Sequence, residues 1–363
     1  MKFVIFGLTV SSSWGNGHAT LWRGLIRALS RRGHHVVFFE KDVPYYASHR
    51  DLCALSEAEL ILYREWDEVV AEAGRHADDA DVAMFTSYCP DGVSASELIL
   101  SSNAALRVFY DLDTPVTLNL LRAGKPVPYL GSEGLRHFDL VLSYTGGLAL
   151  AQLQTQLGAR RVAPLYGSVD PEVHRPVEPS ELFQCHLSYL GTYAEDRQRA
   201  LETLFIEPAR RLPEKKFLIG GAMYPENFPW TPNIFFARHV APGDHARFYC
   251  SSALTVNVTR GVMADMGYCP SGRLFEAAAC GIPILSDSWE GLEQFFQPDK
   301  EILVAADTDD AVTALSLPKI ELSEIAARAR ERTLAEHTAD NRAASLETAI
   351  EEAFTANDNL SPA

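Results

Sequence analysis

The sequence feature that most constrains the fold is the alternation of short, unbroken apolar runs with segments of helical periodicity. Residues 3–10 form a continuous apolar run, residues 18–32 follow with a helical period, and residues 35–40 form a second apolar run. Apolar runs of this kind mark strands that are buried on both faces, and strands separated by helices form parallel sheets. The pattern therefore predicts an α/β fold whose parallel sheet is covered by helices on both faces.

The alternation continues along the chain with one interruption, at residues 163–178, which hold three prolines and no helical period. Further strands are expected at residues 82–87, 107–112, 140–144, 186–190, 217–220, 234–237, 254–258, 284–286 and 303–305. Further helices are expected at residues 66–73, 94–102, 148–157, 194–211, 243–251, 321–337 and 338–354. A chain of 363 residues is too long for one ordinary core. We therefore expect a first domain at 1–170, a second at 171–338, and a final helix and tail at 339–363.

Composition excludes several classes of function. The net charge of −16 disfavours nonspecific binding to nucleic acid or to an anionic membrane, both of which need basic patches. No run approaches the roughly 20 apolar residues of a membrane span, and the apolar N-terminus fits a buried first strand better than a signal peptide. Six scattered cysteines without zinc spacing indicate free thiols in a reducing compartment, so we expect a cytoplasmic protein. They are Cys53, Cys89, Cys185, Cys250, Cys269 and Cys280.

Residues 255–281 carry the most specific pattern in the chain. An apolar strand runs into a loop, and a helix then begins at Pro270-Ser271-Gly272 and stops at Gly281. The free backbone N–H groups and the dipole at a helix start attract phosphate groups, so Ser271 and Gly272 are candidate ligands of a nucleotide diphosphate.

This segment resembles the donor site of the GT-B glycosyltransferases, especially of their CgeB-like branch. In that branch an Arg-x-Phe-Glu run, here Arg273 to Glu276, leads into a small-residue helix that ends in Cys-Gly. The resemblance is specific over residues 185–310 and architectural elsewhere. It implies an α/β GT-B fold: two Rossmann-like domains facing across a cleft, with the C-terminal helix packing back on the N-terminal domain. The implied activity is transfer of a sugar from a nucleotide diphosphate sugar to an acceptor hydroxyl, on a small molecule, a glycan or another acceptor.

Glu276 lies in an apolar stretch of the donor helix, where an unpaired carboxylate would be costly to bury. The hydroxyl groups of a ribose are one expected partner, and the resemblance favours them. An ion pair with Arg273, three residues earlier on the same helical face, is the alternative. Many GT-B enzymes have a second glutamate eight positions earlier, near the sugar, where this chain has Tyr268.

Three arginines, Arg197, Arg260 and Arg273, are candidates for binding the diphosphate. Transfer from a nucleotide sugar builds negative charge on the departing phosphate, and cations must stabilise that charge where no metal does. Arg260 follows a strand end, where ligands of such sheets collect, and is also a catalytic candidate. Each arginine taken alone would more often be a surface residue; CgeB-like proteins resemble this chain at all three positions.

Two loops of the second half complete the expected donor site. Gly191 and Thr192 form the first strand-to-helix turn, where glycine lets the backbone approach a phosphate, although such glycines are common without a ligand. His239 and Val240 follow a later strand, where related enzymes hold the base through backbone atoms.

In the first half, Gly15 and Gly17 precede a helix that opens with His18. The position that a dinucleotide fingerprint gives to a third glycine is Thr20, so this loop is not that fingerprint. The resemblance instead implies a glycine-rich loop that closes over the donor sugar. His18 is a candidate base or phosphate contact, and a surface or capping histidine is the alternative.

Asp111 and Asp113 end another strand of the first half, in the run Tyr-Asp-Leu-Asp-Thr-Pro. Paired carboxylates at the edge of a sheet suit a general base that deprotonates an acceptor hydroxyl. The alternative is that Asp113 caps the helix that begins with Thr114. Metal-dependent GT-A enzymes use paired aspartates, and Asp111-x-Asp113 is the only imitation of such a pair in the sequence. Asp113 is followed by Thr-Pro and a helix, so we discount the pair and expect no metal and no other cofactor.

Three other functions remain open at this point. A nucleotide-sugar epimerase of the same shape would need more acid–base residues around the sugar than the sequence offers. A non-catalytic structural member is a second alternative, and the Arg273–Glu276 pair with Arg260 argues against loss of donor binding. An NAD-dependent oxidoreductase is disfavoured because neither half has the three-glycine fingerprint followed by an acidic residue.

Overall fold

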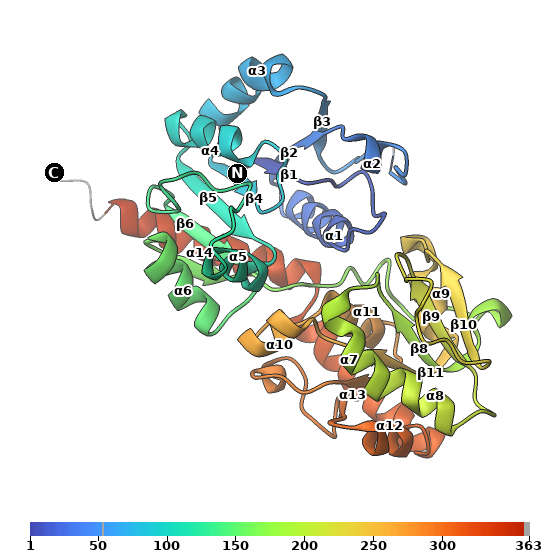
Figure 1. Ribbon diagram of the computed structural model, residues 1–363. Coiled ribbons are helices and arrows are strands. Elements are labelled where there is room, and N and C mark those ends of the chain that lie inside the picture. The colour runs from blue at the N-terminus through green and yellow to red at the C-terminus, as the bar shows by residue number, and fades with distance from the viewer. Residues whose placement is uncertain (53, 359–363) are drawn as a thin grey trace. The chain divides into compact units, whose positions relative to one another are not determined.

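The computed structural model describes residues 1–52 and 54–358, so the predictions for Cys53 and for the tail at 359–363 lie outside the described residues. The chain divides into two compact units (Figure 1). Unit 1 consists of residues 1–166 together with the segment from residue 339 onward, and unit 2 of residues 167–338. The expected boundaries at residues 170 and 338 lie at or near these divisions.

Unit 1 is built on a parallel sheet with the strand order β3-β2-β1-β4-β5-β6-β7. Its strands are β1 (Lys2–Gly7), β2 (His35–Lys41), β3 (Glu59–Tyr63), β4 (Val82–Thr86), β5 (Leu106–Asp111), β6 (Leu140–Ser143) and β7 (Val162–Pro164). All pairings are parallel, as the apolar runs predicted. The chain reverses its direction of travel across the sheet between β1 and β4, where ligands of doubly wound sheets bind.

Helices cover both faces of this sheet. They are α1 (His18–Arg31), α2 (Pro44–Ala47), α3 (Trp66–Asp78), α4 (Gly92–Ser101), α5 (Thr114–Arg122), α6 (Leu148–Leu157) and α14 (Ala339–Asp358). In β1, Phe3 and Ile5 pack into the core cluster of α1 and α14, whereas Val4 and Phe6 pack into the cluster of α3, α4 and α6. Successive side chains of a strand point to opposite faces, so an unbroken apolar run fills both cores.

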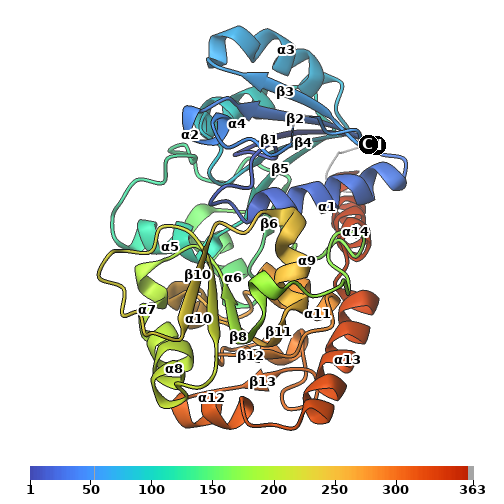
Figure 2. The same ribbon diagram turned by 90° about the vertical axis from the view of Figure 1, so that its right-hand side faces the viewer.

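The last helix packs on unit 1, as the resemblance implied. Figure 2 shows α14 beside α1, and its Leu346 and Ile350 are buried in the core shared with α1 and β1. Polar contacts at the surface reinforce this packing: Arg31 Nη2 lies 3.0 Å from Asp340 Oδ2, and His34 Nε2 lies 2.6 Å from Glu347 Oε1. The helix continues through Asp358, four residues beyond the end expected at residue 354.

Unit 2 is built on a second parallel sheet with the order β10-β9-β8-β11-β12-β13. Its strands are β8 (Cys185–Leu190), β9 (Phe217–Gly221), β10 (Ile234–Arg238), β11 (Ser252–Asn257), β12 (Ile284–Ser286) and β13 (Leu303–Val304). Numbered within the unit, this order is 3-2-1-4-5-6, which is the order of dinucleotide-binding Rossmann folds. The first six strands of unit 1 repeat it, so the two units are topological copies with their switch points at β1/β4 and β8/β11.

The helical segments of unit 2 are η1 (Glu181–Phe183), η2 (Glu195–Arg197), α7 (Gln198–Leu201), η3 (Glu202–Ile206), α8 (Glu207–Arg211), α9 (Pro242–Cys250), α10 (Gly261–Met266), α11 (Gly272–Ala279), η4 (Leu292–Gln294), α12 (Thr308–Ala314) and α13 (Lys319–Glu336). The single helix expected at 194–211 is divided into a 3₁₀ turn, two α-helical turns and a π-helical turn between them. The long loop expected before the donor helix contains α10.

Within the described part of the chain, no helix is both long enough and apolar enough to cross a bilayer. Five of the six cysteines are described, and all five are free thiols, as expected. They are Cys89, Cys185, Cys250, Cys269 and Cys280.

Candidate functional site

At the switch point of unit 2, the turn after β8 is packed tightly against the neighbouring strand β9. Gly191 donates its N–H to the carbonyl of Gly220 at 2.8 Å, and a Cβ added to Gly221 would lie 2.0 Å from the carbonyl oxygen of Gly191. A Cβ added to Gly191 itself would lie 2.7 Å from the hydroxyl of Tyr189. Backbone packing therefore requires glycine at position 221, and a side chain at position 191 would displace the Tyr189 hydroxyl.

Arg197 lies one short turn beyond this loop and points back towards it. Its Nη1 donates to the carbonyl oxygen of Thr192 at 3.1 Å, while its Nε is buried and has no hydrogen-bond partner among the described residues. Burial, and then the nearby charge of Arg273, lower the pKa of Arg197 below its ordinary value. The side chain is therefore held in a positive environment with part of its hydrogen-bonding capacity unused.

Arg273, on the first turn of α11, lies against the same region. Its guanidinium carbon is 5.8 Å from the ring centroid of Tyr189, and its Nη1 donates to Asn257 Oδ1 at 3.4 Å. Asn257 is the last residue of β11, so this contact fixes the arginine at the carboxyl end of the central strands. Two like charges, on Arg197 and Arg273, thus share one end of the sheet, an arrangement that favours a bound anion.

Among the residues that the structure describes, Arg260 lies close to Arg197 and Arg273 but, unlike them, forms an ion pair with a carboxylate. Its Nε is 3.1 Å from Asp196 Oδ2, and both side chains are about one-third exposed. The loop that carries it is fixed by Asp287, whose carboxylate accepts the backbone N–H of Thr259 at 3.0 Å and its hydroxyl at 2.9 Å. The structure therefore brings the three predicted arginines together and gives one of them a carboxylate partner.

The helix α11 begins at Gly272, as the sequence indicated. Ser271 is the N-cap residue and has an extended backbone, but its side chain makes no capping hydrogen bond. A helix start without a side-chain cap leaves its first N–H groups for another acceptor. The start of α11 is therefore suited to a phosphate oxygen, and Arg273 lies on its first turn.

Glu276 lies one turn further along α11 and is surrounded by polar side chains. Its carboxylate oxygens are 3.9 Å from His174 Nε2 and 3.9 Å from His245 Nδ1, and the hydroxyl of Tyr249 donates to it at 3.4 Å. Burial alone would raise the pKa of Glu276, but His174, His245 and Arg273 lower it below the ordinary value. In residues 1–52 and 54–358 no ion pair joins Arg273 to Glu276, so the predicted alternative partner is wrong.

Two further predicted residues lie at the end of β10. His239 has a positive φ of 53°, which is uncommon for a residue with a side chain, and its N–H donates to the carbonyl of Gly221 at 2.8 Å. The carbonyl oxygen of Val240 accepts a hydrogen bond from His245 Nε2 at 3.2 Å. The backbone of these residues is therefore tied to the rest of unit 2.

Tyr268 occupies the position at which many GT-B enzymes have a second glutamate. Its φ is 47°, its N–H donates to the carbonyl of Glu290 at 2.6 Å, and a Cβ added to Gly291 would lie 2.4 Å from its ring. The aromatic ring thus packs against the loop after β12, and Gly291 makes room for it.

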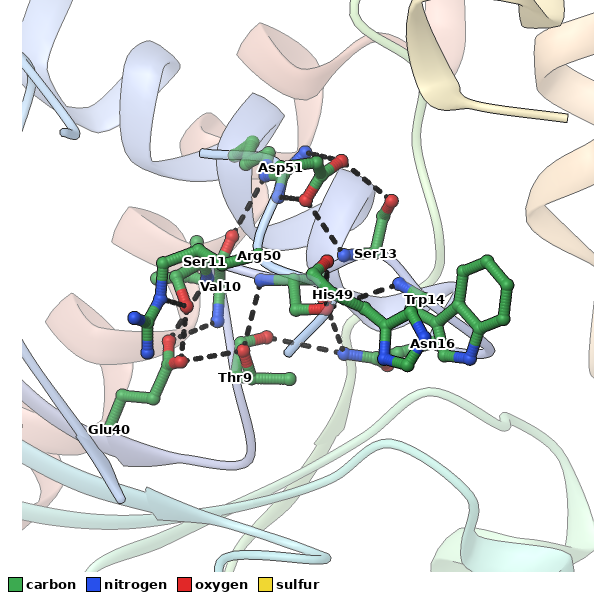
Figure 3. Close-up of polar contacts among 12 residues, drawn as sticks. Thr9, Val10, Ser11, Ser13, Trp14, Asn16, Glu40, His49, Arg50 and Asp51 are labelled. Carbon is green, nitrogen blue, oxygen red and sulfur yellow. Dashed lines mark hydrogen bonds and ion pairs between the residues drawn. The ribbon is translucent and has the colours of Figure 1, made fainter. Parts of the chain in front are cut away.

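In unit 1, a buried carboxylate shapes the loop between β1 and α1. Glu40, near the end of β2, is 1% exposed and accepts hydrogen bonds from the hydroxyl of Thr9 at 2.7 Å and from the backbone N–H groups of Val10 at 2.7 Å and Ser11 at 3.0 Å. Figure 3 shows these contacts converging on its two oxygens. One side chain therefore fixes three successive residues of the loop.

A second carboxylate fixes the middle of the same loop. Asp51 accepts from the N–H and hydroxyl of Ser13 at 3.0 and 2.7 Å, and from Arg23 Nη2 at 2.7 Å. The ring of Trp14 stacks on that of His49 with centroids 4.1 Å apart. The loop is held at several points along its length before the helix begins.

These contacts define where His18 lies. Gly15 has a φ of 61°, which favours glycine, and Gly17 is the N-cap residue of α1. The backbone N–H of His18 donates to Asn16 Oδ1 at 3.1 Å, so Asn16 supplies the cap that glycine cannot. The capping alternative for the His18 side chain is therefore unsupported.

The structure brings His18 and Asp113 together. His18 Nε2 lies 3.8 Å from Asp113 Oδ2, with the two side chains 22% and 15% exposed. Asp113 is the N-cap residue of α5, but its side chain makes no capping hydrogen bond, so it is free of the structural role considered for it. Tyr88, which has a positive φ of 63°, lies beside this pair, and burial followed by the charge of Asp113 raises its pKa.

Asp111 and Asp113 occupy different environments. Asp111 is fully buried, its Oδ1 accepts the backbone N–H of Asp113 at 3.2 Å, and its Oδ2 has no partner within the described part of the chain. Burial raises the pKa of Asp111 to about 6. Asp113 is therefore the one that can reach a ligand, and Asp111 lies behind it.

Residues missed by sequence reasoning surround both sites. Glu40 could have been noticed, because a glutamate within an apolar strand needs buried partners. His174 lies in the proline-rich connector and His245 in α9, and neither belongs to a pattern that places it beside Glu276. Only the folded sheet brings those two histidines to α11.

Residues 197–348 match a protein family described as glycosyl transferase-like. No curated protein matches the whole sequence closely enough to count as a relative. The match includes the arginine cluster, α11 and the segment that carries His245.

Solved structures resemble the chain along nearly its whole length. A sucrose-phosphate synthase from Thermosynechococcus elongatus has a TM-score of 0.71 at 15% identity, covering 98% of this chain and 100% of that one. Anabaena Alr3699/HepE in complex with UDP and glucose has a TM-score of 0.66 at 14% identity, covering 97% and 100%. An alpha-glucosyltransferase in complex with UDP has a TM-score of 0.69 at 11% identity, covering 97% and 100%.

Each likeness at this level of identity establishes a fold, which is shared here over nearly the whole length of both chains. The CgeB-like branch stays a prediction. The chain therefore has the GT-B fold of the glycosyltransferases, and its residues 197–348 match the glycosyl transferase-like family.

Proposed function

We propose that this protein transfers a sugar from a nucleotide diphosphate sugar to an acceptor hydroxyl, without a metal ion in the transfer step. The observation that carries the proposal is the pair of arginines, Arg197 and Arg273, at the carboxyl end of the central strands of unit 2. Arg197 keeps an unpartnered Nε in a positive environment. Such a pair is stabilised when a doubly charged diphosphate binds, because the anion offsets their mutual repulsion.

The same groups supply the chemistry of the leaving group. As the bond from the sugar to the phosphate breaks, negative charge grows on the departing oxygen, and preorganised cations and helix N–H groups stabilise it. Arg197, Arg273 and the start of α11 at Gly272 provide these groups. Arg260, paired with Asp196, holds its loop and is available to the diphosphate if that ion pair opens.

The nucleoside part of the donor is assigned to Glu276 and to the backbone at His239 and Val240. A carboxylate whose pKa is lowered stays ionised at neutral pH and accepts hydrogen bonds from the two ribose hydroxyls. Several similar structures were solved with UDP, so uridine diphosphate is the first nucleotide to test.

In unit 1, Asp113 is proposed to accept the proton of the acceptor hydroxyl, with His18 beside it. The two side chains are partly exposed and lie 3.8 Å apart, which suits proton transfer through one partner or both. One similar alpha-glucosyltransferase was solved with DNA, whereas the net charge of −16 of this chain favours an acceptor other than nucleic acid.

A thermal-shift and calorimetric screen against UDP, GDP, ADP, CMP, dTDP and their common sugar conjugates tests the proposal. We expect one diphosphate to stabilise the protein equally with magnesium and with EDTA. The variant Arg273→Ala should lose this stabilisation, while the exposed-surface variant Arg199→Ala should keep it. A shift that requires magnesium would contradict metal independence, and no shift with any nucleotide would contradict donor binding.

A further inference from the structure

Three side chains of unit 2 place metal-binding atoms around one point. His174, His245 and Glu276 each offer one ligand atom, and these atoms lie within 4.8 Å of one another. The three residues come from the proline-rich connector, from α9 and from α11, so the cluster joins segments that are distant in sequence. The side chains of His174, Glu276 and His245 are only 4%, 13% and 16% exposed.

The orientation of His245 is fixed by the backbone. Its Nε2 donates to the carbonyl oxygen of Val240 at 3.2 Å, which leaves Nδ1 facing Glu276 Oε2 at 3.9 Å. In the neutral ring this Nδ1 carries a lone pair rather than a proton. A lone pair and a carboxylate that face each other in a buried site repel, and a cation between them turns that repulsion into two favourable contacts.

His174 faces the same point from the other side. Its Nε2 is 3.9 Å from Glu276 Oε1, and neither ring nitrogen has a hydrogen-bond partner in the part of the chain that the structure describes. A polar group buried without a partner costs free energy, so a ligand that bound to the ring of His174 would stabilise the folded protein.

We propose that His174, His245 and Glu276 form a binding site for a divalent transition-metal ion of the Zn²⁺ class. Two imidazoles and one carboxylate are a donor set that this class of ion prefers, and three protein ligands leave a fourth position open. Because the three ligand atoms lie within 4.8 Å of one another, a point between them is at most about 2.8 Å from each, and shifts of up to about 0.8 Å reach bonding distances of about 2.0–2.1 Å. The contact from His245 to the Val240 carbonyl is the outer contact that metal-binding histidines usually make.

The site is separate from the arginines assigned to the diphosphate, but it shares Glu276 with the proposed ribose contact, so a bound ion and the ribose hydroxyls would compete for that carboxylate. A bound ion would connect the proline-rich connector, α9 and α11 through one centre. Hard ions such as Mg²⁺ prefer oxygen ligands, so the two imidazoles select against them.

Titration of the chelator-treated full chain with Zn²⁺ and with Co²⁺ tests the site directly, without any nucleotide. We expect one equivalent of each ion to bind, and Co²⁺ to show the visible absorption of a four-coordinate nitrogen and oxygen site. The variants His174→Gln and His245→Gln should each bind on the order of 100-fold more weakly. The exposed histidine of the same unit, in His186→Gln, should leave binding unchanged.

Far-UV circular dichroism of each variant distinguishes lost ligation from lost folding. Failure of the wild-type protein to bind Zn²⁺ would overturn the proposal whatever the variants do. Equal affinity in wild type and both variants would also overturn it, because the ion would then sit elsewhere.

Discussion

At its switch point unit 2 gathers positive charge, on Arg197 and Arg273, whereas the corresponding end of the sheet in unit 1 carries Asp111, Asp113 and His18. The strand order is the same in both units over their first six strands. The backbone therefore provides the same kind of location twice, at the carboxyl ends of parallel strands, and the side chains after each strand decide which charge the location attracts.

The two units also differ in the pKa of a buried carboxyl group. Glu276 in unit 2 has two histidines and an arginine nearby, and its pKa is lowered below the ordinary value. Asp111 in unit 1 lies next to Asp113 and has an oxygen without a partner, and burial raises its pKa to about 6. Burial raises the pKa of a carboxyl in both places, and the positive neighbours that Glu276 has and Asp111 lacks reverse the direction at Glu276.

The contrast predicts that changes in unit 1 affect turnover and leave nucleotide binding intact. In Asp113→Asn the proposed proton acceptor is lost, so we expect turnover to fall by roughly 10²- to 10⁴-fold. Steady-state kinetics with the donor identified by the screen measures the fall, and calorimetry should give an unchanged nucleotide affinity. The exposed-site variant Asp67→Asn is the control; a fall in nucleotide affinity equal to the fall in turnover would contradict the division of roles.

Changes in the arginine cluster of unit 2 should lower both turnover and nucleotide affinity. Removing the guanidinium in Arg197→Ala takes a positive group away from the leaving phosphate, and we expect turnover to fall by roughly 10²- to 10³-fold. Nucleotide affinity should fall as well, in a salt-dependent way, because the lost contact is electrostatic. Arg199→Ala, on the next turn, should behave as wild type; a purely structural role for Arg197 would instead lower the melting temperature and leave affinity unchanged.

The raised pKa of Asp111 predicts a specific dependence of stability on pH. The pKa of Asp111 is about 6 in the folded protein, against an ordinary value of 3.8, so the folded state binds the proton more tightly than the unfolded state. The resulting contribution to stability is complete below pH 4 and is lost as the pH rises through 6. It amounts to about 3 kcal/mol. Urea unfolding of wild type and Asp111→Asn between pH 4 and 7 should show the difference shifting in favour of the variant; a constant difference would disprove a raised pKa.

The smallest expected effect concerns the ribose. In Glu276→Gln the charged acceptor becomes neutral, and we expect nucleotide affinity to fall by about 1.5–3 kcal/mol. Calorimetry with the nucleotide and with its 2′-deoxy analogue separates this effect from general damage. The analogue should bind wild type more weakly than the parent nucleotide, but the variant should discriminate less between the two; equal discrimination would place the ribose elsewhere.

Much of this architecture could be predicted from the sequence, because a strand buried on both faces needs an unbroken apolar run. Residues 35–40 are such a run, and they form β2. The edge strand β3, by contrast, was missed because Glu59 and Leu62 are exposed and its pattern is not apolar throughout. The short helix α10 was missed because it holds only six residues and ends at Gly267, which has a φ of 70°.

Some residues of the candidate sites could also be placed from the sequence, and others could not. Arg260 and Asp113 could be placed because each follows a strand, and the carboxyl ends of parallel strands meet at one edge. The partners of Glu276 could not, since His174 and His245 precede it by about a hundred and about thirty residues and no local pattern links them to α11. The same is true of Asp51, whose contacts with Ser13 and Arg23 depend on how two loops meet.

The return of α14 to unit 1 has a consequence for the order in which the protein is made. Unit 2 is one contiguous stretch, residues 167–338, and can complete its fold as soon as that stretch has left the ribosome. Unit 1 begins first but finishes last, because Leu346 and Ile350, which close its core, are synthesised after all of unit 2. During that interval α1 already covers part of the sheet face that carries Phe3 and Ile5, but the part that α14 covers stays open to chaperones, and a chain stopped at residue 338 would leave that part open permanently.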